Sequence, residues 1–434
     1  MRYSILLCTA LLASLCAAAQ PSARIYRTET LPYDTRHDAE ARDRAASGRR
    51  IDFRPQAQPT EGATIVGQRI EIPYVWTDGF IYLHLENPGS AYTLRVNGRE
   101  AARVDDALTP AEFDITEYIR QGVNDFEVRF SDASDRLGYA APAPRAPFEG
   151  SYLHYRNGRS IRDFEMALVP DTLGRDFAML DLKIVVQNGF NYDETIEAGY
   201  DIYSPQGKLL DFDIRPVTVA GRSTDTIRFA PFIYHAYENK WEPGSKNPPL
   251  YKVMLFTRRD GVYKEYMPLR VGFGKTEWVD GQLVRFGKPI ALDAVRCNAA
   301  SDAATTAAQL RSLRKQGHRM VAPDYPQPEW FYDLCDELGL YVVDRANIHA
   351  PEHRTDRRVG GTPSNDPALV DRYLERVQAM YYRSRNHTCV AAYALGGEAG
   401  NGYCLYKAYQ WLKSVEKSRP VICVDADGEW NSDL

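Results

Sequence analysis

The last third of the chain alternates short apolar runs with amphipathic segments, and this alternation constrains the fold more than any other feature. Five apolar runs predict strands, at 290–299, 318–326, 340–348, 389–397 and 420–427. Four segments between them predict helices, at 303–317, 328–339, 366–385 and 403–417. Strands that alternate with helices form parallel β/α units, because each helix carries the chain back before the next strand begins. The sequence therefore predicts an α/β domain in residues 274–434.

The preceding residues show strand and turn patterns instead. In residues 20–163 short alternating strands surround turn signals such as Asn97-Gly98, and this spacing is typical of a jelly-roll sandwich. In residues 164–273 about seven more short strands follow, which predict an immunoglobulin-like sandwich. The expected fold class is a multidomain β protein followed by an α/β part.

Residues 1–19 have the pattern of a signal peptide. Arg2 supplies a positive start, residues 5–15 are apolar but too short to span a bilayer, and small residues precede Gln20. We expect cleavage before Gln20 and an exported protein, periplasmic or secreted, with no transmembrane segment. The alternative is a lipid anchor on Cys16, which we do not expect because a leucine precedes that cysteine.

Charge and cysteine content exclude several kinds of partner and site. The formal net charge is −5 and the pI is about 6.0, so the chain lacks the basic footprint of a nucleic-acid-binding protein. The cysteines that follow the leader form no Cys-x-x-Cys pair, so neither a metal nor a cofactor is expected. Buried free thiols are the expected state, with one disulfide as the alternative. These cysteines are Cys297, Cys335, Cys389, Cys404 and Cys423.

Several longer stretches resemble one known family. They are "VNGRE" and "PAEFDITEYIRQGVNDFEV" in the first predicted sandwich, and "DYPQPEWFYDLCDELGLYVVDRANI" and "RSRNHTCVAAYALGGEAGNG" in the last third. These stretches are similar to sequences of glycoside hydrolase family 2, the β-galactosidase and β-glucuronidase group. The resemblance covers most of the chain from about Tyr74 onward. It implies that residues 274–434 form an incomplete (β/α) barrel of the TIM type, about strands one to five, in a protein of carbohydrate metabolism.

The resemblance also implies a catalytic residue. Enzymes of this family act with retention, in which one carboxylate attacks the sugar and a second carboxyl group, about 5 Å away, donates a proton. Glu398, within "YALGGEAG", matches the proton donor, although Gly397 stands where the family has asparagine. Further family residues are replaced in the runs 296–299, 323–326 and 344–351, the last of which removes a magnesium site of many β-galactosidases. The alternative for Glu398 is an inherited residue that now packs or hydrogen-bonds locally.

The second carboxylate decides the expected activity. In the family the nucleophile is a glutamate on strand seven, whereas this sequence reaches Leu434 just past a fifth predicted strand. Glu429, in the loop after that strand, is not a credible replacement. We therefore expect an exported β-galactosidase-like homologue that is inactive or weakly active in this form, a pseudoenzyme. The alternatives are a non-catalytic scaffold that binds a glycan or a protein, and a reading frame that continues past residue 434.

Two smaller expectations follow from the last third. A closed barrel of eight strands has no edges, whereas five strands leave two, so we expect self-association through the open side. His349 lies close to Asp344 and Arg345, where it could mark a polar site, but a single histidine in a loop is usually structural or solvated. His387, before the fourth predicted strand, is interpreted as structural.

Overall fold

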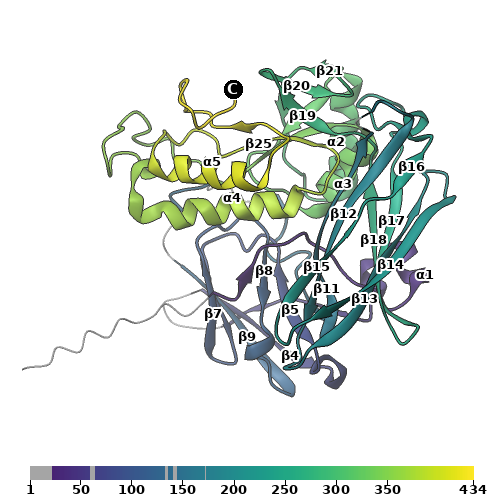
Figure 1. Ribbon diagram of the computed structural model, residues 1–434. Helices are drawn as coiled ribbons and strands as arrows, with labels where there is room; N and C mark the ends of the chain where they lie inside the picture. Colours follow the sequence, from purple (N-terminus) through teal and green to yellow (C-terminus); the bar gives the residue numbers. More distant parts are fainter. Residues whose placement is uncertain (1–21, 59–63, 132–134, 140–143, 172) are drawn as a thin grey trace, which may run out of the picture.

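Three bodies of secondary structure succeed one another along the chain in the computed structural model (Figure 1). A first β-sandwich lies at the bottom of the view, a second β-sandwich stands on the right, and the helices of the third body lie across the top. The structure describes residues 22–58, 64–131, 135–139, 144–171 and 173–434. The expected signal peptide and Cys16 lie outside the described residues. Within the described part, no helix is both long enough and apolar enough to cross a membrane.

The first sandwich consists of two antiparallel five-stranded sheets, ordered β1-β8-β5-β10-β2 and β3-β4-β9-β6-β7. Residues of β4 and β9 largely alternate between buried and partly or fully exposed, as expected for strands with one face on a core. The hairpin between β6 and β7 turns at Asn97 and Gly98, whose φ angles of 51° and 79° confirm the predicted turn. The strands are β1 (Arg24–Ile25), β2 (Arg50–Asp52), β3 (Gln56–Gln58), β4 (Ile65–Ile72), β5 (Phe80–Leu85), β6 (Tyr92–Val96), β7 (Arg99–Val104), β8 (Ala111–Asp114), β9 (Gly122–Phe130) and β10 (Tyr152–Arg156).

The second sandwich packs two antiparallel sheets face to face. One has the order β11-β12-β15 with β16 paired to β12, and the other has the order β14-β13-β17-β18. Ile184, Ile202 and Leu255 are fully buried between them, which confirms the predicted second β-sandwich. The short helix α1 (Arg36–Ala41) packs against β18. The strands are β11 (Arg159–Pro170), β12 (Phe177–Asn188), β13 (Glu194–Tyr203), β14 (Leu209–Val219), β15 (Thr224–Phe229), β16 (Phe232–Tyr234), β17 (Tyr251–Arg259) and β18 (Val262–Val271).

The third body is built on a five-stranded parallel sheet in the order β22-β23-β24-β25-β26, which confirms the predicted β/α units. Local capping residues set the helix ends. The Asp302 side chain accepts a hydrogen bond from Thr305 N at 2.8 Å, and Gly339 ends α3 with a φ of 66°. The elements are β22 (Ala294–Arg296), α2 (Ala303–Lys315), β23 (Met320–Ala322), α3 (Glu329–Leu338), β24 (Tyr341–Arg345), α4 (Val370–Ser384), β25 (Val390–Ala394), α5 (Tyr403–Val415) and β26 (Val421–Ile422).

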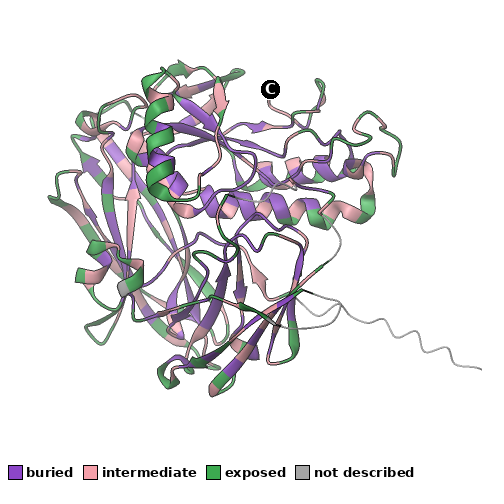
Figure 2. Ribbon diagram, turned by 180° about the vertical axis from the view of Figure 1, so that it is seen from behind, coloured by how far each residue is buried: buried purple, intermediate pink, exposed green. Residues whose placement is uncertain are grey.

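The central strands of this sheet are covered on both faces. Val321, Val342 and Ala392 have no exposed surface, and Figure 2 shows the strands as buried while the helices are partly exposed. All five cysteines of the described residues are free, and only Cys297 is incompletely buried, so the expectation of free thiols is confirmed.

A separate three-stranded sheet lies at the amino ends of the parallel strands. It consists of β19 (Thr276–Val279), β20 (Gln282–Arg285) and β21 (Lys288–Ile290). Ile290 pairs with Leu283 in this small sheet, so the prediction that the first parallel strand starts at Ile290 is wrong. Leu283 is buried in the core of the third body, and Trp278 N donates to Ser418 O at 2.7 Å. Apolar character alone did not reveal the hairpin that separates the two strands.

The two edges of the parallel sheet differ. At the β26 edge, Val421 N donates to Asp433 Oδ2 at 2.7 Å, and Asp433 N donates to Val421 O at 2.8 Å. Cys423 N also donates to Ser432 Oγ at 3.1 Å. The prediction that this edge is unpaired is therefore wrong, because residues 432–433 fold back onto it. At the other edge, β22 pairs only with β23 among the described residues.

Candidate active site

Polar side chains gather at the carboxyl ends of the parallel strands, which meet at the same edge of the sheet. Arg296 ends β22, Asp324 follows β23, Arg345 ends β24 and Glu398 follows β25. The sequence predicts a functional role for Glu398 alone. We treat this edge as the candidate active site.

Asp324 connects three of the strands. Its carboxylate is buried and accepts hydrogen bonds from Arg296 Nε and Asn298 Nδ2, both at 2.8 Å. Arg345 Nη1 lies 3.7 Å from its other oxygen. The Asn298 side chain also accepts from Asp324 N at 2.8 Å. The oxygens of Asp324 are therefore occupied by contacts from both neighbouring strands.

The side chain of Asp344 points to the face of the sheet opposite that of Arg345, because successive residues of a strand point to opposite faces. It is fully buried, and its Oδ1 accepts hydrogen bonds from Tyr332 Oη at 2.9 Å and from Arg345 N at 3.0 Å. Burial raises the pKa of Asp344 to about 6. Since Tyr332 lies on α3, Asp344 belongs to the layer between the sheet and that helix, and not to the candidate active site.

Glu398 is exposed and paired with an arginine. Its side chain is 54% exposed, and Arg354 Nη1 lies 2.5 Å from its Oε1. This hydrogen bond raises the pKa of Arg354, which lies in the loop after β24. A general acid must reach the leaving group to donate its proton, whereas Oε1 of Glu398 is already engaged by Arg354. No local signal in the sequence identifies Arg354 as the partner.

Beside Glu398, Tyr139 of the first sandwich stacks on His349. The ring centroids lie 4.3 Å apart and the ring planes differ by 3°. Burial lowers the pKa of His349, and its Nδ1 is buried without a hydrogen bond. A Cβ atom added to Gly397 would lie 2.7 Å from the Tyr139 hydroxyl and 3.3 Å from His349 Nδ1. The sequence places His349 in this loop but carries no signal that identifies Tyr139.

Backbone contacts join the loops after β24 and β25. Gly397 N donates to Ile348 O at 2.7 Å, and Ala350 N donates to Glu398 O at 2.9 Å. A Cβ atom on Gly396 would lie 2.7 Å from both the Cβ and the backbone oxygen of Ile348, so only glycine fits there without a shift. The first glycine of "GGE" is therefore explained by close approach of the two loops.

Glu429, which follows β26, is held by its neighbours. Tyr406 Oη donates to Glu429 Oε2 at 2.5 Å, and the Arg357 guanidinium forms an ion pair with Oε1. These two contacts lower the pKa of Glu429. Both carboxylate oxygens are thus used within the loops. This geometry agrees with the interpretation that Glu429 is no replacement for a nucleophile.

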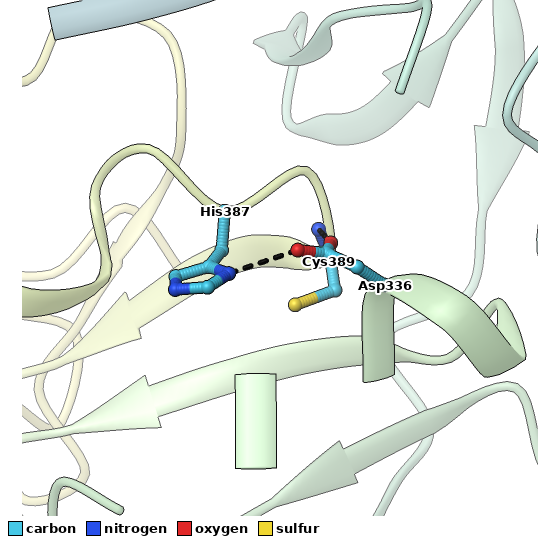
Figure 3. Close-up of side chains that lie close together, drawn as sticks. All are labelled: Asp336, His387 and Cys389. Atoms are coloured by element: carbon cyan, nitrogen blue, oxygen red, sulfur yellow. Dashed lines mark hydrogen bonds and ion pairs between the residues drawn. The ribbon is translucent and has the colours of Figure 1, made fainter. Parts of the chain in front are cut away.

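A cluster of potential metal ligands lies before β25, at the opposite end of the strands from the candidate active site. It consists of Asp336, His387 and Cys389 (Figure 3). His387 Nδ1 lies 2.8 Å from Asp336 Oδ2, its Nε2 lies 3.3 Å from Glu329 Oε1, and Cys389 N donates to Asp336 Oδ1 at 2.7 Å. Burial disfavours the imidazolium, but the two carboxylates raise the pKa of His387 well above its ordinary value. Both ring nitrogens and both Asp336 oxygens are used, which agrees with the structural interpretation of His387.

The sequence of this chain is similar to those of known glycoside hydrolases. Residues 309–433 match the family model for the TIM barrel domain of glycosyl hydrolases family 2. A β-galactosidase of Vibrio cholerae is 28% identical over 356 residues, which are 79% of this chain and 34% of that protein. A β-galactosidase of Oenococcus oeni is 27% identical over 396 residues, 85% of this chain and 36% of that protein. The chain spans about a third of the length of these curated relatives.

Solved structures show the same architecture. A β-glucuronidase of Bacteroides uniformis superposes with a TM-score of 0.69 over 84% of this chain and 46% of that chain, at 17% sequence identity. At this identity the likeness concerns the fold. It agrees with two β-sandwiches followed by part of a TIM-type barrel, as the sequence predicts.

Proposed function

Because this chain belongs to glycoside hydrolase family 2, we propose that it serves carbohydrate metabolism as an exported, β-galactosidase-like homologue, inactive or weakly active in this form. Its carbohydrate site is the candidate active site. Binding sites for small ligands combine apolar or aromatic walls with a few placed polar groups. Here the aromatic groups are Tyr139 and Tyr325, with ring centroids 6.4 Å apart, and the polar groups include Arg345 and Glu398.

The Arg354–Glu398 ion pair is the observation that carries the proposal of weak activity. Retention requires a protonated acid and a free carboxylate nucleophile roughly 5–5.5 Å apart. Oε1 of Glu398 is already engaged by Arg354, so this oxygen is not free to contact a leaving group. Asp324 and Glu429 are each held by an arginine as well, so neither is a free nucleophile.

We expect no measurable hydrolysis of nitrophenyl β-galactoside or nitrophenyl β-glucuronide by the purified 434-residue chain. Release of nitrophenolate measures this, with Glu398→Gln as the matched variant. Slow turnover that disappears in Glu398→Gln would identify weak activity of this site, whereas turnover as fast as that of a complete β-galactosidase would contradict the proposal. Turnover that is equal in both proteins would identify a contaminating enzyme.

A non-catalytic scaffold that binds a glycan is the second candidate, and the same ion pair favours it. Calorimetric titration with methyl β-galactoside and methyl β-glucuronide separates the two. Binding without turnover supports the scaffold, whereas binding with slow turnover supports a weak enzyme.

The exported location rests on residues 1–19, with their positive start, apolar run and small residues before Gln20. Intact-mass measurement of protein recovered from a Gram-negative host tests it. A retained leader, or the added mass of acyl chains on Cys16, would contradict cleavage before Gln20.

A further inference from the structure

We infer that Tyr139 is a sugar-contacting residue of the carbohydrate site, contributed to the barrel-type body by the first sandwich. Its ring forms a fixed wall, and its hydroxyl is a hydrogen-bonding group beside Glu398. This inference rests on the proposed function, since it concerns the same site.

Tyr139 is held in place from both sides. Tyr139 N donates to Asn347 Oδ1 at 3.0 Å, and His349 N donates to Leu137 O at 2.7 Å. Leu137 is buried within the core of the third body. Two hydrogen bonds and a core contact therefore join the segment 135–139 to the loop after β24.

A buried ion pair completes this attachment. Arg376 of α4 donates to both oxygens of Asp135, at 2.7 Å and 3.0 Å, and both side chains are almost fully buried. Arg376 Nη1 also donates to Asn347 O at 2.6 Å. Planar, two-bond contacts between arginine and a carboxylate restrict orientation. Segment 135–139 is thus an integral wall and not a movable lid.

The Tyr139 ring lies among the loops that follow three of the parallel strands. Tyr139 stacks on His349 after β24 and also lies close to Tyr325 after β23. Its hydroxyl occupies the space that a side chain at Gly397 would need, directly before Glu398. The ring therefore reaches the carboxyl ends of three neighbouring strands.

The chemistry of the tyrosine side chain suits a sugar. A tyrosine combines a flat apolar ring with a hydroxyl that both donates and accepts, which suits the C–H face and the hydroxyl groups of a sugar. One face of the ring is covered by His349, so its hydroxyl and remaining surface contact the ligand. A side chain larger than that of glycine at position 397 would clash with the Tyr139 hydroxyl. Gly397 and Tyr139 together therefore determine the shape of the site.

Two variants separate the hydroxyl from the ring. Tyr139→Phe keeps the stack on His349 and removes the hydroxyl, whereas Tyr139→Ala removes both. Calorimetric titration with methyl β-galactoside and methyl β-glucuronide should show an affinity roughly 3- to 10-fold lower for Tyr139→Phe and a larger loss for Tyr139→Ala. Tyr192→Phe, at a 58% exposed tyrosine of the second sandwich, is the matched control and should bind as the unaltered chain.

A readout without sugar tests the geometry. In the unaltered chain Gly397→Ala places a methyl group against the Tyr139 hydroxyl, so its melting temperature should fall. The fall should be smaller in Tyr139→Phe, which lacks that oxygen. In Tyr139→Ala the pKa of His349, followed by NMR, should rise toward its ordinary value because the covering ring is gone.

The outcomes are distinguishable. If the unaltered chain binds neither glycoside, the proposed function fails and the sugar contact of Tyr139 fails with it. If the unaltered chain binds a glycoside and both Tyr139 variants bind it equally well, the proposed function stands and the role of Tyr139 is overturned. If Gly397→Ala lowers the melting temperature equally with and without the Tyr139 hydroxyl, the inferred clash between position 397 and Tyr139 is also overturned.

Discussion

A fully buried carboxyl group at Asp344 makes the stability of this protein depend on pH. Burial raises its pKa to about 6, above the value of about 3.9 expected in the unfolded chain. Between these two pH values the folded state binds a proton that the unfolded state has released. The contribution of Asp344 to stability therefore falls as the pH rises from about 4 to 6 and remains lower above that window.

Asp344→Asn should remove this dependence. The amide oxygen can still accept from Tyr332 and from Arg345 N, but no charge has to be buried. At pH 7.5 we expect the free energy of unfolding to increase by roughly 1–3 kcal/mol. Urea unfolding at several pH values measures it, with Asp260→Asn at an exposed turn as the control. Lower stability of Asp344→Asn at pH 7.5, or an unchanged slope between pH 4 and 6, would contradict the argument.

At the scale of elements, the two edge strands of the parallel sheet have different surroundings. The β26 edge is hydrogen-bonded by Ser432 and Asp433, whereas β22 has a partner on one side only among the described residues. An unpaired edge offers backbone groups to another chain. Arg296, whose side chain is 73% exposed, gives the short β22 edge a charge that weakens such pairing without removing it.

We therefore predict weak self-association through the β22 side. Light scattering across a dilution series should give an average mass above that of the monomer at high concentration, and this mass should fall on dilution. A constant monomer mass at every concentration would show that the β22 edge is protected in another way.

At the scale of the whole molecule, arginines of α4 and the loop after it hold the three bodies together. Arg376 binds Asp135 of the first sandwich, Arg383 Nη1 donates to Glu29 Oε2 at 2.8 Å, and Arg385 Nη2 donates to Asp163 Oδ2 at 2.7 Å. Removal of one partner from a buried ion pair leaves an uncompensated charge, which costs about 3–5 kcal/mol.

Arg376→Gln should therefore lower the free energy of unfolding by several kcal/mol, on the order of the 3–5 kcal/mol cited for such pairs. Hydrogen exchange should become faster in residues 135–139 and at His349, which bonds to Leu137 O. Arg372→Gln is the matched control, because Arg372 lies one turn earlier on α4 and pairs with Asp105 at the surface. Its effect should stay within about 0.5 kcal/mol. Equal effects of the two changes would contradict a special role for Arg376.

The sequence by itself determined the order of the bodies and most element types. Hairpin residues such as Asn97-Gly98, the cap at Gly339 and the alternation of strands with helices act between near neighbours, so they can be identified locally. The stretches that resemble glycoside hydrolase family 2 likewise identified Glu398 as a residue in the loop after the fourth parallel strand.

Only the tertiary structure decided what surrounds Glu398 and how the edges are paired. Tyr139 and Asn347 are 208 residues apart, and Asp135 and Arg376 are 241 apart, so no periodicity or spacing links them. The same holds for the return of residues 432–433 onto β26, which depends on hydrogen bonds made only once the strand has formed. Local patterns specify elements, because their causes lie within a few residues. Which residues line the site depends on contacts between segments that are distant in the sequence, and only the packing of the folded chain creates these contacts.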